Sequence, residues 1–150
     1  MKLPTFLVAV ILVSLSSGCR DHSVGRLVVD GGSTPRFSFI GSSVSGLVVY
    51  RVPPEYLDKG IPLDETRKDG PNTFWMLDGD HNAAEPIIYG VVPAGVKAVV
   101  PAKPLQERAV YFVSGYVGTR DTGAFVGQYF IIHDGRTQEF HGEGGENSNR

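Results

Sequence analysis

The sequence is poor in the features that identify a specific chemistry. It has one cysteine in 150 residues, which excludes an internal disulfide and a metal site built from cysteines. Acidic residues (16) slightly outnumber basic ones (14), and no block of basic charge indicates a nucleic-acid partner. The longest apolar run, residues 6–13, is far shorter than the roughly 20 residues that span a bilayer as a helix.

What the sequence does contain is typical of one globular β-domain. Apolar residues make up 41% of the chain and charged residues 20%, so it has enough apolar content to bury a core. Glycine (19) and proline (10) are frequent, and they fall between short apolar stretches. This spacing predicts strands joined by turns.

The first residues have the pattern of a secretory signal peptide. Lys2 provides a positive start, residues 6–13 form a short apolar core, and the small residues at 16–18 follow. We therefore expect residues 1–18 to be a signal peptide that is removed after export. The alternative is that this segment is a buried strand or helix of the domain.

The single cysteine stands directly after these small residues. The stretch LSSGC at 15–19 resembles the lipobox of bacterial lipoproteins, although that family prefers leucine at the position of Ser16. The resemblance implies that Cys19 is diacylated and becomes the first residue of the mature protein, with residues 19–25 as a tether. The alternative is ordinary cleavage nearby, which would leave a free thiol at Cys19 in an oxidising compartment.

The resemblance also implies a location in the cell envelope. Each buried methylene of an acyl chain contributes roughly 0.8 kcal/mol, so several chains together, palmitate among them, form a stable membrane anchor. In lipoproteins of Gram-negative bacteria, aspartate directly after the cysteine commonly marks retention in the inner membrane. Here Arg20 occupies that position, which, if the cell is Gram-negative, favours the periplasmic side of the outer membrane.

The rest of the chain predicts an all-β fold. We expect a single antiparallel β-sandwich over residues 26–140, with a small β-barrel as the alternative, and a flexible tail at 141–150, which lacks apolar content. No amphipathic helix of ten or more residues is found, but Pro54 and Gly60 bracket a possible single helical turn. Asp134 and Gly135 predict a tight hairpin turn. The expected strands are residues 26–30, 36–40, 46–53, 73–77, 86–92, 96–100, 109–119, 124–133 and 136–140.

Two aromatic residues refine this prediction. Leu105 precedes Tyr111 by six residues, and this spacing resembles the tyrosine corner of fibronectin type III and immunoglobulin-like sandwiches. The resemblance implies that the Tyr111 hydroxyl bonds back to nearby backbone. Trp75, the only tryptophan, is expected to fill the core, with a surface position for stacking on sugar as the alternative.

The polar stretch DGDHNAAE provides the main candidate for a metal site. Asp78, Asp80 and Asn82 have the alternating spacing that opens many calcium loops. The loop class with flanking helices also requires glycine at its sixth place and glutamate at its twelfth, where this chain has Ala83 and Tyr89. We therefore interpret the stretch as a polar hairpin loop and predict no bound metal or other cofactor.

No catalytic residue is predicted. In GSSVSG, Gly41 and Ser43 begin a G-x-S-x-G pattern that Ser45 breaks, which favours a glycine–serine turn between strands. The four histidines, at positions 22, 81, 133 and 141, are far apart and lack metalloprotease spacing. The structure would have to bring His81 or His133 beside a carboxylate to support an enzyme.

Two classes of function are consistent with these observations. The first is a membrane-anchored envelope lipoprotein whose sandwich is a non-catalytic domain that binds or scaffolds another envelope protein. The second is a lipid-anchored hydrolase whose site is assembled from distant residues. The sequence favours the first, and residues 53–72 are the candidate contact, because this long segment without strand character places mixed charges around apolar side chains. The alternative is that these apolar residues only cover one end of the sandwich.

We expect Cys19→Ala to abolish the incorporation of labelled fatty acid and to leave the chain unprocessed in the membrane, because no thiol remains to accept the lipid. Metabolic labelling followed by gel electrophoresis measures both effects. Ser17→Ala is the matched control, since it keeps a small residue beside the cysteine and should be labelled normally. Normal labelling and processing of Cys19→Ala would contradict the lipobox interpretation.

Overall fold

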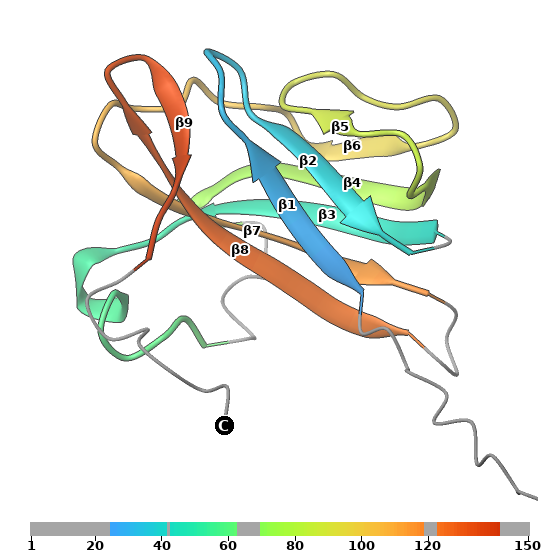
Figure 1. Cartoon of the computed structure of the whole chain (residues 1–150), viewed down its shortest axis with the longest axis horizontal. Helices are drawn as coiled ribbons and strands as arrows, with labels where there is room; N and C mark the ends of the chain where they lie inside the picture. The colour runs from blue at the N-terminus through green and yellow to red at the C-terminus, as the bar shows by residue number, and fades with distance from the viewer. Residues whose placement is uncertain (1–24, 42, 63–69, 119–122, 142–150) are drawn as a thin grey trace, which may run out of the picture.

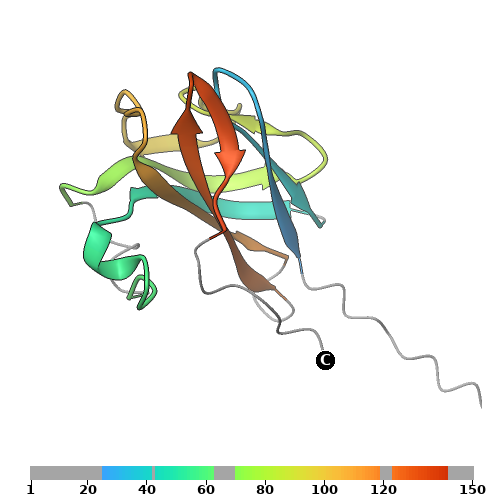
Figure 2. The same cartoon turned by 60° about the vertical axis from the view of Figure 1, so that its left-hand side comes forward.

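The computed structural model describes residues 25–41, 43–62, 70–118 and 123–141, which form two antiparallel β-sheets (Figure 1). The large sheet has the strand order β6-β4-β3-β7-β8-β9 and the small sheet has the order β1-β2-β5, and in Figures 1 and 2 the small sheet crosses one face of the large one. The strands are β1 (Arg26–Asp30), β2 (Arg36–Ile40), β3 (Ser43–Arg51), β4 (Thr73–Asn82), β5 (Ile87–Ile88), β6 (Lys97–Val100), β7 (Val110–Val117), β8 (Ala124–His133) and β9 (Arg136–Glu139).

The predicted all-β sandwich is therefore confirmed. The described strands form two separate sheets instead of one closed sheet, so the small barrel was the wrong alternative. The described residues contain no α-helix, and none of their helical segments is long and apolar enough to cross a membrane. The expected signal peptide, Cys19, most of the expected tether and residues 142–150 of the expected tail lie outside the described residues.

The core lies between the two sheets and follows the period-two alternation of the strands. Along β7, Tyr111, Val113, Gly115 and Val117 are buried, while Phe112, Ser114 and Tyr116 between them are partly exposed. Full burial of one large apolar side chain contributes about 1.5–3 kcal/mol, so this alternation fixes which face of each strand points inward. The two sheets together bury Leu27, Val29, Phe37, Phe39, Ile87, Leu47, Val49, Phe74, Trp75, Leu77, Val126, Phe130 and Ile132.

Tyr111 lies at the centre of this core. Its ring is fully buried, stacks on Phe130 with ring centres 5.4 Å apart, and meets the edge of Phe74 at 5.2 Å. The backbone N–H of Gln106 donates a hydrogen bond of 2.8 Å to the Tyr111 hydroxyl oxygen, as the tyrosine-corner interpretation requires. Burial raises the pKa of the Tyr111 hydroxyl above its ordinary value.

Trp75 also lies in the core, as predicted, so it is not a surface platform for sugar. It packs edge-to-face on Tyr89 with ring centres 5.2 Å apart. The Tyr89 hydroxyl donates a hydrogen bond of 2.8 Å to the Lys103 carbonyl, and burial raises the pKa of this hydroxyl above its ordinary value. A bulge in β4 leaves Phe74 without a partner on β3, which allows both Phe74 and Trp75 to be buried.

Two segments predicted as turns are strands. Strand β4 continues to Asn82, so the polar stretch that we interpreted as a loop is mostly ladder, and β3 begins at Ser43, inside the expected glycine–serine turn. The two segments pair with each other, with Ser45 opposite Asp80 and Ser43 opposite Asn82. Backbone pairing with a neighbour thus outweighs the low strand propensity of these residues. By contrast, the strand expected over 86–92 is only Ile87–Ile88.

Two connections match their predictions. Asp134 and Gly135 have φ values of 51° and 66° and form the tight turn between β8 and β9. The segment after β3 forms one 3₁₀ turn, Pro54–Tyr56, and ends at Gly60, where φ is 77° and the N–H donates to the Tyr56 carbonyl. Within the candidate contact loop, residues 63–69 lie outside the described residues.

We expect Tyr111→Phe to lower the free energy of unfolding by roughly 1–2 kcal/mol, because the partly buried hydrogen bond from the Gln106 N–H loses its acceptor. Urea unfolding measures the loss. Tyr129→Phe is the matched control, since the Tyr129 hydroxyl makes no hydrogen bond within the described residues. An unchanged midpoint for Tyr111→Phe would show that this hydrogen bond does not stabilise the sandwich.

Candidate functional site

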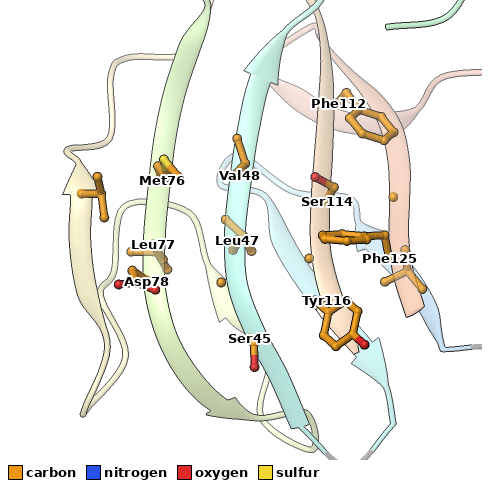
Figure 3. Close-up of a pocket in the computed structure, with 15 residues that line it drawn as sticks. Ser45, Leu47, Val48, Met76, Leu77, Asp78, Phe112, Ser114, Tyr116 and Phe125 are labelled. Carbon is orange, nitrogen blue, oxygen red and sulfur yellow. The ribbon is translucent and has the colours of Figure 1, made fainter. Parts of the chain in front are cut away.

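The large sheet carries a groove on the face turned away from the small sheet. Its direction follows from Gly115, which points at Phe39 of the small sheet, so its neighbours Ser114 and Tyr116 point the opposite way. The groove has a cavity volume of about 430 Å³ (Figure 3). We call it the outer groove and define it by Val48, Met76, Phe112, Ser114, Tyr116 and Phe125.

The strand register arranges the outer groove in rows that run across the sheet. The middle row joins Met76, Val48, Ser114 and Gly127 on four neighbouring strands, and its side chains are aliphatic or small. On one side of this row, Phe112 pairs with Tyr129, with ring centres 4.8 Å apart.

On the other side, Tyr116 pairs with Phe125, with ring centres 5.1 Å apart. The hollow is therefore the gap between two cross-strand aromatic pairs, where Ser114 and Gly127 provide little side-chain volume.

Gly127 is required for the shape of one wall. A Cβ atom at this position would lie 2.3 Å from Cζ of Phe112, so the Phe112 ring lies against the backbone of β8. Any larger residue at 127 would push this ring away from the strand and toward the groove. The sequence signal for the groove is therefore a glycine opposite a serine, between two aromatic pairs.

The outer groove leaves large apolar side chains in water. Phe125 is 58% exposed, and Val99, which lines the groove from β6, is 45% exposed. A contiguous exposed apolar patch of this kind marks a contact surface in soluble domains more often than a scattered apolar residue does. Covering it would recover roughly 25 cal/mol for each Å² removed from water.

One end of the outer groove is acidic. Asp80 continues the row of Ser45, Tyr116 and Phe125, and the Ser45 hydroxyl donates a hydrogen bond to the Asp80 carboxylate. Asp78 lies two residues away on the same strand and lines both the groove and a second hollow of about 650 Å³ that Asp80 also lines. Among the described residues, no lysine, arginine or histidine nitrogen lies within 4 Å of either carboxylate.

Two glycines shape this acidic end. Gly46 has a φ of 67°, and the β3 register shifts there against both of its neighbours. Gly79 has a φ of 123° at the corresponding place on β4. Bulges of this type bend strands and increase local twist, so the sheet curves where the apolar groove meets the two carboxylates.

The calcium candidates are not arranged around one point. Asp78 and Asp80 share the outer face, but Asn82 uses its side-chain oxygen to accept a hydrogen bond of 3.0 Å from the Ala84 N–H. Within residues 25–41, 43–62, 70–118 and 123–141, no cluster of three or more histidine, cysteine, aspartate or glutamate side chains is suited to a metal ion.

The histidine candidates do not meet a nucleophile in the described part of the chain. His81 alternates with Asp80 along β4, so it lies on the opposite face, where its Nε2 is 3.0 Å from the Glu85 carbonyl oxygen. His133 contacts the Asp134 carboxylate at 3.3 Å, but both side chains are exposed at the β8–β9 turn. Ser45 has a carboxylate partner and no histidine base.

Sequence reasoning missed the aromatic residues of the outer groove. The signal was present, because β7 and β8 carry apolar residues on both faces, but this pattern is also typical of strands that are buried on both sides. In the described structure only one face of these strands meets the other sheet, and Phe125 on the second face is exposed.

Comparison of the chain with protein-family models, with curated proteins and with solved structures finds no match.

We expect Gly127→Ala to lower the free energy of unfolding by roughly 1 kcal/mol, because the added Cβ displaces the Phe112 ring. In a Phe112→Ala background the same change should cost almost nothing, and a double-mutant cycle in urea measures the difference. Gly70→Ala is the matched control, because a Cβ there meets no atom within 4 Å. Equal losses in both backgrounds would contradict the role of Gly127 in seating this ring.

Proposed function

We propose that this protein is a membrane-anchored cell-envelope lipoprotein whose β-sandwich is a non-catalytic domain that binds another envelope component through the outer groove. The observation that carries the proposal of binding is the outer groove itself, an aromatic hollow on an uncovered sheet face. The lipobox-like stretch at 15–19 supports the anchor, with acylation at Cys19. The residue after the cysteine, Arg20, favours the outer membrane on its periplasmic side.

The position of the first strand supports a partner close to the membrane. Gly25, directly before β1, lies against Val117 at the end of β7, and Tyr116 beside it belongs to the outer groove. Gly25 follows Cys19 by six positions, and an extended chain over six steps spans at most roughly 20 Å. An acylated Cys19 would therefore hold this end of the sandwich, and with it the outer groove, near the bilayer surface.

We also propose that the sandwich is immunoglobulin-like. The hydrogen bond between Gln106 and Tyr111 supports an immunoglobulin-like sandwich, the class in which tyrosine corners are common. Such sandwiches commonly serve as binding modules, but fold alone does not define a ligand. The ligand has to be argued from the outer groove.

The loop at 53–72 is retained only as a second contact. Its described part, Leu57 included, lines a separate hollow of about 290 Å³ together with Arg51 and Arg108. This hollow shares no lining residue with the outer groove. The two surfaces can therefore be tested independently.

We expect a photocrosslinker, p-benzoylphenylalanine, placed at position 125 of the membrane-bound protein to capture a defined partner, because Phe125 borders the outer groove and is exposed. The matched control is the same group at position 40, since Ile40 is 55% exposed but does not line the groove. Crosslinked bands from whole membranes, separated and identified by mass spectrometry, provide the measurement.

Two further variants decide which surface binds. Val48→Asp, which places a charge in the groove, should remove the crosslinks from position 125. Shortening residues 58–70 to a Gly-Ser turn should leave them in place. Identical bands from positions 40 and 125, or crosslinks that survive Val48→Asp, would contradict binding through the outer groove.

A further inference from the structure

The outer groove differs along its length, and this difference restricts what it accepts. Its middle row, Met76, Val48, Ser114 and Gly127, has no charged member. The next row ends in Asp80, and Asp78 lines the groove beside it. A bound molecule would therefore contact an apolar hollow in the middle of the groove and carboxylates at one end.

The charge at this end is only partly balanced. Lys97 on β6 stands opposite Asp78 in the register, without an ion pair between them in the described structure. The pairing of β4 with β6 covers only Met76 to Asp78, so no β6 residue stands beside Asp80. One oxygen of Asp80 accepts the hydrogen bond from Ser45, and a hydroxyl does not neutralise a carboxylate. The acidic end is thus complementary to a cation, with Asp80 as its main partner.

Strand geometry sets the spacing between the two features. We call the row of Asp80, Ser45, Tyr116 and Phe125 the acidic row. Ser114 in the middle row and Tyr116 in the acidic row are two residues apart on β7, so the two rows lie roughly 7 Å apart. In an extended peptide, side chains two residues apart point to the same side and are separated by the same distance. A long cationic side chain then reaches sideways from the acidic row toward β4.

We propose that the outer groove binds an extended peptide segment in which a large apolar side chain is followed two residues later by lysine or arginine. The apolar side chain fills the gap over Val48 and Ser114 between the two aromatic pairs. The cationic group meets Asp80, with Asp78 beside it. This inference rests on the proposed binding function and names the chemistry of the partner.

Charge complementarity favours a peptide over a membrane lipid as the occupant. An acyl chain would suit the apolar rows equally well, but the phosphate of a phospholipid would lie near the carboxylates of Asp78 and Asp80. Like charges at a binding surface are unfavourable and act against the wrong partner. The carboxylates therefore strengthen the binding of a basic peptide and weaken the binding of an anionic lipid.

Met76 provides a selective probe for the test. It is one of two methionines in the chain, and its side chain lines the outer groove (Figure 3). With ¹³C-methyl-methionine, the unprocessed chain gives at most two methyl signals, with Met1 as the internal control, whereas a chain that begins at Cys19 keeps only Met76. Titration with the acetylated and amidated pentapeptide Ala-Phe-Ala-Lys-Ala should shift the Met76 signal and leave the Met1 signal of the unprocessed chain unchanged.

Two peptide variants separate the contributions. Replacing phenylalanine by alanine in the peptide should remove the shift, because the hollow loses its occupant. Replacing lysine by glutamine should weaken binding about two- to fivefold, the range of an exposed ion pair. The Asp80→Asn variant should lose the same factor for the lysine peptide and nothing for the glutamine peptide.

Salt provides the same comparison without a mutation. Raising the ionic strength from about 0.05 to 0.5 M should weaken binding of the lysine peptide, because screening reduces the attraction between exposed charges, and should leave the glutamine peptide unchanged. Equal affinity of the two peptides, or no effect of both salt and Asp80→Asn, would overturn the proposal.

The remaining outcomes distinguish this inference from the proposed function. If no peptide shifts Met76 while crosslinks from position 125 persist, the peptide chemistry is wrong and binding through the groove stands. A shift of Met76 by lysophosphatidylcholine below its micelle concentration, without any response to the peptide, would identify a lipid site and would also overturn the inference. Loss of both the peptide response and the crosslinks would contradict the two proposals together.

Discussion

The stacked contact between Tyr111 and Phe130 is the interaction on which the rest of this sandwich depends. From it, ring contacts continue to Phe37 in the small sheet at 5.8 Å and to Phe74 in the large sheet at 5.2 Å. The hydrogen bond from Gln106 fixes the Tyr111 hydroxyl at one end of this aromatic row. A slip of β7 by one residue would turn this face outward, so the core specifies the register of the strand strongly. The same register fixes the residues on the outer face, and the groove is therefore a consequence of the core.

Much of the fold could be predicted from the sequence, because its signals are local. The spacing between Leu105 and Tyr111 predicted the hydrogen bond of the Tyr111 hydroxyl, and Asp134 with Gly135 predicted the hairpin turn. The prediction was wrong where strand formation depends on a distant partner. Ser45 and Asp80 have low strand propensity, yet they pair across 35 residues of sequence, and no local pattern reports that pairing.

The candidate site could be predicted only in fragments. The spacing of Asp78 and Asp80 drew attention to them, but we placed both residues in a loop, whereas both lie in strand β4. Phe112 and Phe125 belong to apolar stretches whose second face has the composition of a buried one. Whether the second face of a sheet is covered depends on how many layers the chain forms. The described strands form two sheets, so the face of the large sheet turned away from the small one has no partner sheet. The number of layers is a property of the whole chain and not of any window within it.

The contact between Thr137 and Gly32 determines when the domain can close. Both the N–H and the hydroxyl of Thr137 donate to the Gly32 carbonyl, at 2.8 and 3.0 Å, across 105 residues of sequence. Topologies dominated by such distant pairings fold slowly, because the chain entropy of loop closure is lost before the contact forms. The hydrogen bonds that hold the turn between β1 and β2 against β9 can therefore form only after nearly the whole chain has been synthesised. Late closure would suit the export that we propose, because the chain would stay unfolded while it crosses the membrane.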